Sequence, residues 1–418
     1  MAPKSRSALI AGAGIAGPAL ALLLTRIGYK CTIVERAPDF RTSGQQIDVA
    51  GEALKIVKYL GVEDACWAKR VHDDGIKFVD GNDKVNAAFA ASSEAGSLVK
   101  ELEIMRPDLA EVLYDATRTD VEYVFNTTVE TIQQDYSGVT VTLSSAPGKP
   151  RTFDLLVAAD GLRSTTRILA FGEDNTRLVT FNQYAGYFTI PWSERDGSWS
   201  KWYNAPGGRC VAIRPNVGNK TTGAYLCQVT PDAGEVATME PAEQKRVLAE
   251  RFKDAGWESG RILKYLAGPE GETFYCQEVA QTKSQRLVTG RVALLGDAGY
   301  CPAPISGQGS SIALIGAYIL AGCLSTHDDV EEALKEYERQ VRPFADAAQN
   351  LPPGIPWIVN PQSAWAITAL NRAFNVADVV VNSGLAGVIG KIVSPLASLL
   401  GGRALVLPEY PGIHLQAK

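Results

Sequence analysis

The sequence predicts an α/β protein with a discontinuous first domain, an inserted, mainly antiparallel β-sheet domain and a helical C-terminal tail. Three observations lead to this prediction. Residues 7–34 have the pattern of a strand, a glycine turn, a helix and a second strand, which is one βαβ unit. From about 176 to 280, aromatic and turn residues become frequent and apolar positions alternate with polar ones. Residues 284–350 return to the strand–loop–helix pattern, and a Pro-rich break at 351–357 precedes the tail.

The individual elements follow from hydrophobic periodicity and from turn residues. Helices are expected over 16–27, 52–60 and 108–118. In the first domain, strands are expected over 7–11, 30–34, 121–125, 128–133, 138–143 and 153–158. In the inserted domain, they are expected over 183–190, 209–214 and 223–229.

The composition is that of an ordinary soluble globular protein. The chain has 418 residues, of which 46% are hydrophobic and 21% are charged, which is enough for two domains. A net charge of −5 and the lack of a Lys/Arg-rich run argue against nucleic-acid binding. Seven scattered cysteines without a Cys-x-x-Cys pair, and three widely spaced histidines, predict neither a metal site nor a disulfide framework. Reduced thiols in the cytoplasm are the expectation.

Two apolar segments resemble membrane-related sequences. Residues 8–24 follow two basic residues as in a signal peptide, but three regularly spaced glycines argue against that interpretation. Residues 374–402 are apolar but interrupted by polar residues and a proline, so a packed helix pair or an interfacial helix is expected rather than a membrane span. No sequence pattern indicates the oligomeric state.

A glycine fingerprint, Gly12-x-Gly14-x-Ala16-Gly17, connects the first strand to the first helix. The first glycine permits a tight turn, the second lets a pyrophosphate approach the backbone, and the third allows close contact between helix and strand. Glu35 ends the second strand 23 residues after Gly12, where its carboxylate can accept from ribose hydroxyls and disfavours a 2′-phosphate. The fingerprint therefore predicts FAD or NAD as its ligand.

A second cofactor contact is predicted near residue 297. Asp297 ends a buried strand, a Pro/Gly loop follows, and Ser310 and Ser311 are good N-cap residues for the next apolar helix. Such a helix end offers free N–H groups and partial positive charge. A carboxylate beside a positive helix end suits a cofactor with a hydroxylated chain and a ring that becomes anionic on reduction.

Two further motifs are ambiguous by themselves. Arg106 precedes a helix that begins at Pro107 or Asp108, which fits both a cofactor contact and an exposed position. Asp160-Gly161 is a turn after a buried strand, and Ser164 is placed to cap the next helix, so this motif alone is most simply structural.

The order and spacing of these motifs resemble the class A flavoprotein monooxygenases, the p-hydroxybenzoate hydroxylase superfamily, and more narrowly its tetracycline-inactivating-monooxygenase-like branch. The resemblance covers roughly residues 6–345. It implies a glutathione-reductase-type Rossmann FAD domain with an inserted antiparallel β-sheet substrate domain. The expected division is 1–75, 101–175 and 281–350 for the FAD domain, 76–100 and 176–280 for the substrate domain, and 351–418 for the C-terminal helical segment.

The resemblance also implies a reaction. NADH or NADPH would reduce FAD, O₂ would add at flavin C4a, and the hydroperoxide would pass one oxygen atom to a small aromatic or polycyclic substrate. Hydroxylation, epoxidation and Baeyer–Villiger oxidation all fit, in natural-product metabolism or drug inactivation. The alternatives are a flavin oxidase or dehydrogenase on the same fold, and a non-catalytic flavin-binding accessory protein. A halogenase is disfavoured because no Trp-x-Trp-x-Ile-Pro segment is present.

Carried over residue by residue, the resemblance assigns Glu35 to the adenosine ribose, Arg106 to the flavin and its phosphate side, and Asp297 to the ribityl hydroxyls. The backbone from Gly307 to Ser310 would face the flavin pyrimidine edge. The expected cofactor-binding positions are Gly12, Gly14, Ala16, Gly17, Glu35, Arg36, Asp48, Arg106, Asp160, Gly161, Asp297, Pro304, Gly307, Gly309 and Ser310.

No residue is identified as the substrate-activating base. Tyr184, Tyr187, Tyr203 and Tyr300 are candidates, each with a structural role as the simpler alternative. Arg209 resembles the branch's arginine near the substrate entrance.

The chain departs from the family pattern at three places. The family's histidine after Gly-Asp-Ala-Ala is Tyr300 here, its asparagine in the following helix is Ser311, and its later Asp-Ala is Gly316-Ala317. FAD binding depends mostly on backbone, so these changes leave it possible. They leave open how the flavin or substrate edge is tuned.

Overall fold

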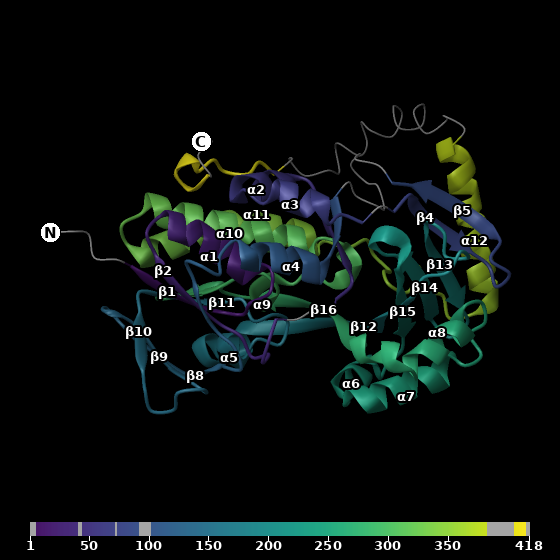
Figure 1. Cartoon of the computed structure of the whole chain (residues 1–418), viewed down its shortest axis with the longest axis horizontal. Coiled ribbons are helices and arrows are strands. Elements are labelled where there is room, and N and C mark those ends of the chain that lie inside the picture. The colour runs from purple at the N-terminus through teal and green to yellow at the C-terminus, as the bar shows by residue number, and fades with distance from the viewer. Residues whose placement is uncertain (1–5, 41–43, 72, 92–101, 383–404, 415–418) are drawn as a thin grey trace.

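A computed structural model describes residues 6–40, 44–71, 73–91, 102–382 and 405–414 (Figure 1). Figure 1 shows a helix-covered sheet at one end of the molecule and a second, larger sheet at the other. The N-terminal strand and the described end of the C-terminal tail both lie at the first end.

The first sheet has six strands in the order β17-β18-β11-β1-β2-β7. The strands are β1 (Ser7–Ala11), β2 (Lys30–Val34), β7 (Glu122–Val124), β11 (Leu155–Ala158), β17 (Val288–Thr289) and β18 (Val292–Leu294). All pair in parallel except the edge strand β17. The helix α1 (Ala16–Arg26) connects β1 to β2, which confirms the predicted βαβ unit.

Helices cover one face of this sheet and a small β-layer lies on the other side (Figure 1). The helices are α2 (Glu52–Leu60), α3 (Glu63–Ala68), α4 (Arg106–Asp115), α10 (Gly309–Thr326) and α11 (Val330–Gln349). The small layer contains β8 (Val129–Asp135), β9 (Gly138–Leu143) and β10 (Arg151–Phe153), with α5 (Thr165–Phe171) beside it. A two-stranded ribbon of β3 (Gln46–Val49) and β6 (Leu102–Met105) leads toward the second sheet.

Two predicted elements need correction. The strand expected over 153–158 is confirmed as β11 from Leu155 to Ala158, but it begins two residues later, because Phe153 belongs to β10 and the chain breaks at Asp154. The carboxylate of Asp154 accepts hydrogen bonds from the backbone N–H and the hydroxyl of Ser7, at 2.7 and 3.0 Å. The helix expected over 108–118 begins two residues earlier, at Arg106, and ends at Asp115.

The second sheet has seven strands in the order β16-β12-β15-β14-β13-β4-β5. The strands are β4 (Gly75–Val79), β5 (Val85–Ala90), β12 (Thr176–Pro191), β13 (Ser200–Ala205), β14 (Arg209–Pro215), β15 (Thr221–Val229) and β16 (Tyr275–Ser284). The helices α6 (Ala233–Thr238), α7 (Pro241–Phe252) and α8 (Ser259–Leu266) pack on one face around Phe252 and Leu248. The three predicted strands of this region are confirmed within β12, β14 and β15; β13 and β16 were not predicted.

Strand β12 spans 16 residues and pairs with β16 and β15. Its pairing with β16 is irregular between Thr180 and Tyr184, where Asn182 has a φ of 50°. Thr180 and Tyr184 are four residues apart, whereas their partners Ala280 and Glu278 are two residues apart. The extra residues form a bulge in β12.

The C-terminal part begins with α12 (Ala364–Asn382), as the predicted helical tail requires. Its Phe374 packs on Phe78 and Phe89 of the second sheet. Residues 383–402 of the apolar stretch lie outside the described residues. Among the described helices, one, α10, is long and apolar enough to cross a membrane, but 83% of that window is buried inside the protein. Helix α10 is therefore a core helix.

Candidate functional site

The glycine fingerprint forms a tightly packed turn between β1 and α1. Gly12 has a φ of +113°, and its N–H donates to the carbonyl of Val34 at 2.8 Å. A Cβ at Gly12 would lie 2.4 Å from the carbonyl oxygen of Ala159, and a Cβ at Gly17 would lie 2.1 Å from that of Gly12. No side chain caps the N-terminus of α1 at Ile15. The exposed N–H groups of such a helix end suit a phosphate.

Glu35 lies against this turn. Its carboxylate accepts hydrogen bonds from the backbone N–H groups of Ala13 and Ala37, both at 2.9 Å. A carboxylate has about four acceptor positions, so two backbone bonds fix its orientation and leave capacity for ribose hydroxyls. Arg36, beside it, is exposed.

Arg106 lies close to both the glycine turn and Asp297. The guanidinium Nη2 of Arg106 is 3.6 Å from the position of a Cβ at Gly14. Burial raises the pKa of Asp297, while the Cys301 thiol and the positive charge of Arg106 act in the opposite direction. The Asp297 side chain is nevertheless accessible to solvent. The Asp297 carboxylate therefore has protein on several sides and is still open to solvent.

The loop after Asp297 approaches Asp48. Ala303 and Gly307 both have left-handed backbone conformations, with φ of +72° and +63°, around the turn Pro304–Ser306. A Cβ at Gly307 would lie 3.3 Å from Oδ2 of Asp48, so this loop passes close to β3. The structure thus places the predicted Asp48 beside the predicted Gly307.

The helix α10 begins with an N-terminus that no side chain caps, at Gln308. The expectation that Ser310 or Ser311 caps it is wrong, because both lie inside the first turn. The hydroxyl of Ser311 instead accepts from the backbone N–H of Ala50 at 3.1 Å. The predicted helix end is nevertheless present, and because no side chain caps it, it presents free N–H groups and partial positive charge.

The Asp160 turn holds the start of α5. The Asp160 carboxylate accepts from the Ser164 hydroxyl and from the N–H and hydroxyl of Thr166, the last at 2.9 Å. Ser164 caps α5 by accepting from the N–H of Arg167, as predicted. Arg167 in turn donates to the carbonyl of Ala298 at 2.7 Å, which joins this turn to the Asp297 segment.

These residues fit FAD. The glycine turn and the uncapped α1 suit a pyrophosphate, Glu35 suits a ribose, Asp297 suits ribityl hydroxyls, and the uncapped α10 suits a ring that carries negative charge. Gly12 and Gly17 have no room for a side chain against the backbone, as this fingerprint requires.

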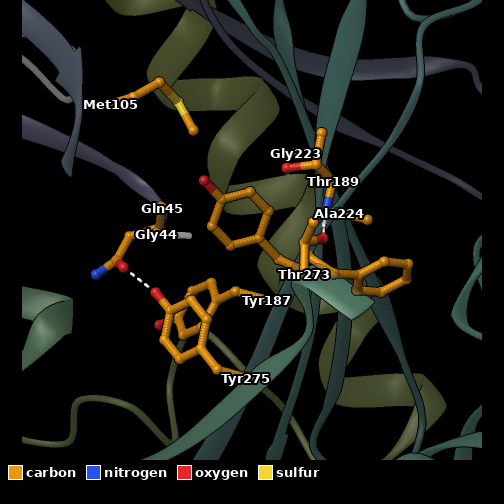
Figure 2. A pocket seen from close by; sticks show the side chains of 11 residues that line it. Gly44, Gln45, Met105, Tyr187, Thr189, Gly223, Ala224, Thr273 and Tyr275 are labelled. Carbon is orange, nitrogen blue, oxygen red and sulfur yellow. Dashed lines mark hydrogen bonds between the residues drawn. The ribbon is translucent and has the colours of Figure 1, made fainter. Parts of the chain in front are cut away.

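A pocket with a volume of about 420 Å³, partly open to solvent, lies between the second sheet and the β3–β6 ribbon (Figure 2). Tyr275 from β16 donates a hydrogen bond to the side-chain oxygen of Gln45, which ties the segment before β3 to the second sheet. The pocket is lined by Gly44, Gln45, Met105, Tyr187, Phe188, Thr189, Gly223, Ala224, Tyr225, Thr273 and Tyr275.

Three of these tyrosines form a row across neighbouring strands. Tyr187 is the register partner of both Tyr225 and Tyr275. Its ring centroid is 5.1 Å from each of theirs, edge-on to Tyr225 and stacked on Tyr275. The same cluster includes Ala303 and Ile305 from the loop after Asp297. The tyrosine row therefore lies next to the loop that the resemblance assigns to the flavin ring.

Of the candidate catalytic residues, only Tyr187 is among the pocket-lining residues. Tyr184 is fully buried on the opposite face of β12, where its hydroxyl donates to Gln228. The Tyr203 hydroxyl donates to the carbonyl of Ala255. Arg209 pairs with Asp254 at 2.5 Å at the end of α7, so the structure does not place it in this pocket lining.

Tyr225, Tyr275 and Gln45 were not identified from the sequence. Alternation predicts which face of a strand a residue occupies, but the partner strand is set by pairing over long separations. The 37 residues between Tyr187 and Tyr225 and the 49 between Tyr225 and Tyr275 carry no signal for that pairing.

Tyr300 and Gly316, two of the departures from the family pattern, are in direct contact. A Cβ at Gly316 would lie within van der Waals overlap of the Tyr300 hydroxyl, so the tyrosine occupies the space of a side chain at 316. The Tyr300 and Tyr337 hydroxyls are 3.0 Å apart, and Tyr337 donates to the carbonyl of Leu294 at 2.8 Å. The two departures therefore form one buried contact between α10 and Tyr300, outside the pocket lining.

We expect Gly316→Ala to destabilise the protein by about 1–3 kcal/mol through overpacking against Tyr300. Adding Tyr300→Phe should recover most of this loss, so the double mutant should deviate from additivity by roughly 1 kcal/mol or more. The measurement is denaturant unfolding of both single mutants and the double mutant. Gly260→Ala in α8, where nothing lies within 4 Å of the new Cβ, is the matched control. Strict additivity would show that the contact is absent.

The sequence profile of the FAD binding domain family matches residues 6–351. A flavin-dependent monooxygenase, eupH, from Phoma sp is 36% identical over 373 residues, covering 83% of this chain and 86% of that protein. A flavin-dependent monooxygenase from Legionella longbeachae serogroup 1 is 31% identical over 419 residues, covering 97% and 99%. The crystal structure of tetracycline destructase Tet(55) superposes with a TM-score of 0.76 at 30% identity, covering 98% of this chain and 100% of that one.

The profile match, the relatives and the geometry of the glycine turn agree with the class A resemblance. The α/β fold with an FAD domain and a β-sheet domain is confirmed, as is the expectation of a flavin enzyme. This chain belongs to the FAD binding domain family and is an FAD-dependent monooxygenase.

Proposed function

We propose that this monooxygenase uses NADH or NADPH and O₂ to hydroxylate a small aromatic or polycyclic molecule in the cytoplasm. The observation that carries the proposal is the row of Tyr225, Tyr187 and Tyr275 beside the loop at Ala303 and Ile305. Aromatic walls favour planar apolar substrates. The similarity to a protein named tetracycline destructase supports a polycyclic substrate and a role in natural-product metabolism or drug inactivation.

Bound FAD would supply the redox chemistry, accepting a hydride from the nicotinamide and activating O₂. The protein's part is to bind, orient and shield. Asp297 would accept hydrogen bonds from the ribityl hydroxyls, and the N-terminus of α10 would favour negative charge on the ring. Tyr187, only 8% exposed, and Tyr275, held by Gln45, limit the access of water to the reacting atoms.

The test is oxygen incorporation. The purified protein should carry FAD and should oxidise NADH or NADPH faster in the presence of a tetracycline or another polyhydroxylated aromatic compound. Under ¹⁸O₂, the product should contain one labelled oxygen atom, detected by mass spectrometry. An unlabelled product would indicate an oxidase or dehydrogenase, and flavin-free protein that cannot be reconstituted would contradict the proposal altogether.

A further inference from the structure

The C-terminal segment 405–414 packs on the helices that cover the first sheet, and Figure 1 shows it in yellow beside α2. We call it the C-terminal strap. Its apolar side chains Leu407, Tyr410 and Ile413 are 4%, 8% and 0% exposed and belong to the core of the first sheet. A Cβ at Gly322 of α10 would overlap the Tyr410 ring, so the glycine leaves the space that the ring fills.

The strap binds the C-terminal halves of two helices whose N-termini suit FAD. Arg26, the last residue of α1, donates from Nη1 to the carbonyl of Ile413 at 3.0 Å. In α10, the Tyr318 hydroxyl accepts from the backbone N–H of Tyr410 at 3.1 Å. The Tyr410 hydroxyl donates to the side-chain oxygen of Gln340 in α11 at 2.5 Å. The strap therefore ties α1, α10 and α11 together, away from the uncapped N-termini of α1 and α10.

His414 holds the end of the strap between two tyrosines. Its ring stacks on Tyr59 of α2, with centroids 3.7 Å apart and an angle of 11° between the planes, and its Nε2 is 2.9 Å from the Tyr318 hydroxyl. Because that hydroxyl already accepts from the N–H of Tyr410, we assign its own proton to the bond with Nε2. This bond needs an unprotonated Nε2. A protonated Nε2 would donate instead, and the Tyr318 proton would lose its acceptor.

The groups around His414 determine what its protonation does. Burial lowers the pKa of His414 from its ordinary value of 6.5; the charge of Glu409 on the strap opposes this effect, and the charge of Arg26 adds to it. Tyr59 and Tyr318 are the titratable groups that contact it from α2 and α10. Because the docked His414 binds a proton less tightly than the free one, docking is favoured above pH 6.5 and is weakened as the pH falls through the lowered pKa.

We propose that the C-terminal strap braces the FAD site while His414 is neutral, and that proton uptake by His414 releases it. The helices α1 and α10 pack on each other, and their N-termini suit the pyrophosphate and the flavin ring. Release of their C-terminal halves therefore weakens the hold on both parts of the cofactor. The inference concerns cofactor retention and goes beyond the proposed function, since it does not depend on which substrate is oxidised.

The test measures amide hydrogen exchange of residues 405–414 in the FAD-loaded protein. Each rate is divided by the intrinsic rate at the same pH, and the ratio reports opening of the strap. Between about pH 7.5 and about pH 5.5, wild-type protection should fall by about threefold to tenfold. His414→Phe keeps a ring that can stack on Tyr59, and His414→Gln keeps an acceptor for Tyr318. Neither side chain titrates in this range, so both variants should show equal protection at the two pH values.

His327→Asn is the matched control, because His327 is a titratable C-cap of the same helix α10 but lies outside the strap. It should behave like the wild type. Equal wild-type protection at the two pH values, or the same fall in both His414 variants, would overturn the pH-dependent release. Stronger protection at the lower pH, as a cation stacked on Tyr59 would give, would overturn it as well.

The bracing role has its own measurement. By reciprocity, if the docked strap favours FAD binding, FAD must favour the docked strap. Strap protection at neutral pH should therefore be higher in the FAD-loaded than in the flavin-free protein, relative to the protection of β15 in the second sheet. Equal relative protection with and without FAD would overturn the bracing role. Because no turnover is involved, these outcomes are independent of the ¹⁸O₂ experiment.

Discussion

Gly12→Ala should abolish FAD binding and destabilise the fold by about 4 kcal/mol or more, in the range of the most damaging single substitutions. The new Cβ would lie 2.4 Å from the carbonyl oxygen and 2.7 Å from the carbonyl carbon of Ala159. Both are backbone atoms at the end of the central strand β11, so no side chain can move aside. Denaturant unfolding and titration with FAD, followed by flavin fluorescence, measure the two effects.

Gly28→Ala is the matched control for this prediction. Gly28 also has a positive φ, +84°, but nothing lies within 4 Å of a Cβ at that position. Its substitution should therefore cost only the backbone strain of about 1–2 kcal/mol and leave FAD affinity unchanged. If Gly12→Ala were no more harmful than Gly28→Ala, the close approach to Ala159 would not be what requires glycine.

Asp297→Ala should weaken FAD binding roughly 10- to 150-fold, which corresponds to about 1.5–3 kcal/mol for a hydrogen bond to a charged acceptor. The carboxylate lies near Arg106 and is open to solvent. A fluorescence titration with FAD at neutral pH measures the change. Full retention of FAD affinity would remove Asp297 from the proposed ribityl contact.

Asp297→Asn should make the cofactor-free protein more stable than the wild type at neutral pH. Because burial raises the pKa of Asp297 above its ordinary value of 3.8, the fold binds the carboxyl proton more tightly than the unfolded chain does. The wild-type protein therefore loses stability as the pH rises from 3.8 through the raised pKa. This decline should be smaller in Asp297→Asn, as measured by thermal unfolding across that pH range. An equal decline in both proteins would contradict the prediction.

Local pattern predicted the central elements of the cofactor-binding part of the fold. The βαβ unit of β1, α1 and β2 is readable because each element is short, apolar and bounded by glycines. The break at Asp154 was missed because it depends on a hydrogen bond to Ser7, 147 residues away in sequence. The cap of α10 was misplaced because the chain uses Ser311 to bind Ala50 instead.

The substrate half needed tertiary information. Tyr187 was chosen from its position in an alternating run, and Tyr184, three residues earlier, looked equivalent. In the sheet they face opposite sides, Tyr184 toward the helices α6–α8 and Tyr187 toward the cofactor loop. Arg209 was chosen by resemblance alone, and Arg214 was not identified from the sequence. The register of β14 with β13 and β15, and the approach of β6, place Arg214 beside Glu103.

The bulge in β12 restricts how this strand can change in length. Thr180 and Tyr184 are separated by two more residues than their partners on β16. Because this number is even, odd-numbered side chains of β12 point to the same face of the sheet before and after the bulge. Gain or loss of a single residue there would turn the aromatic face of β12 away from the cofactor loop and present Tyr184 and Phe188 instead. Insertions and deletions in this segment are therefore compatible with the pocket only in steps of two.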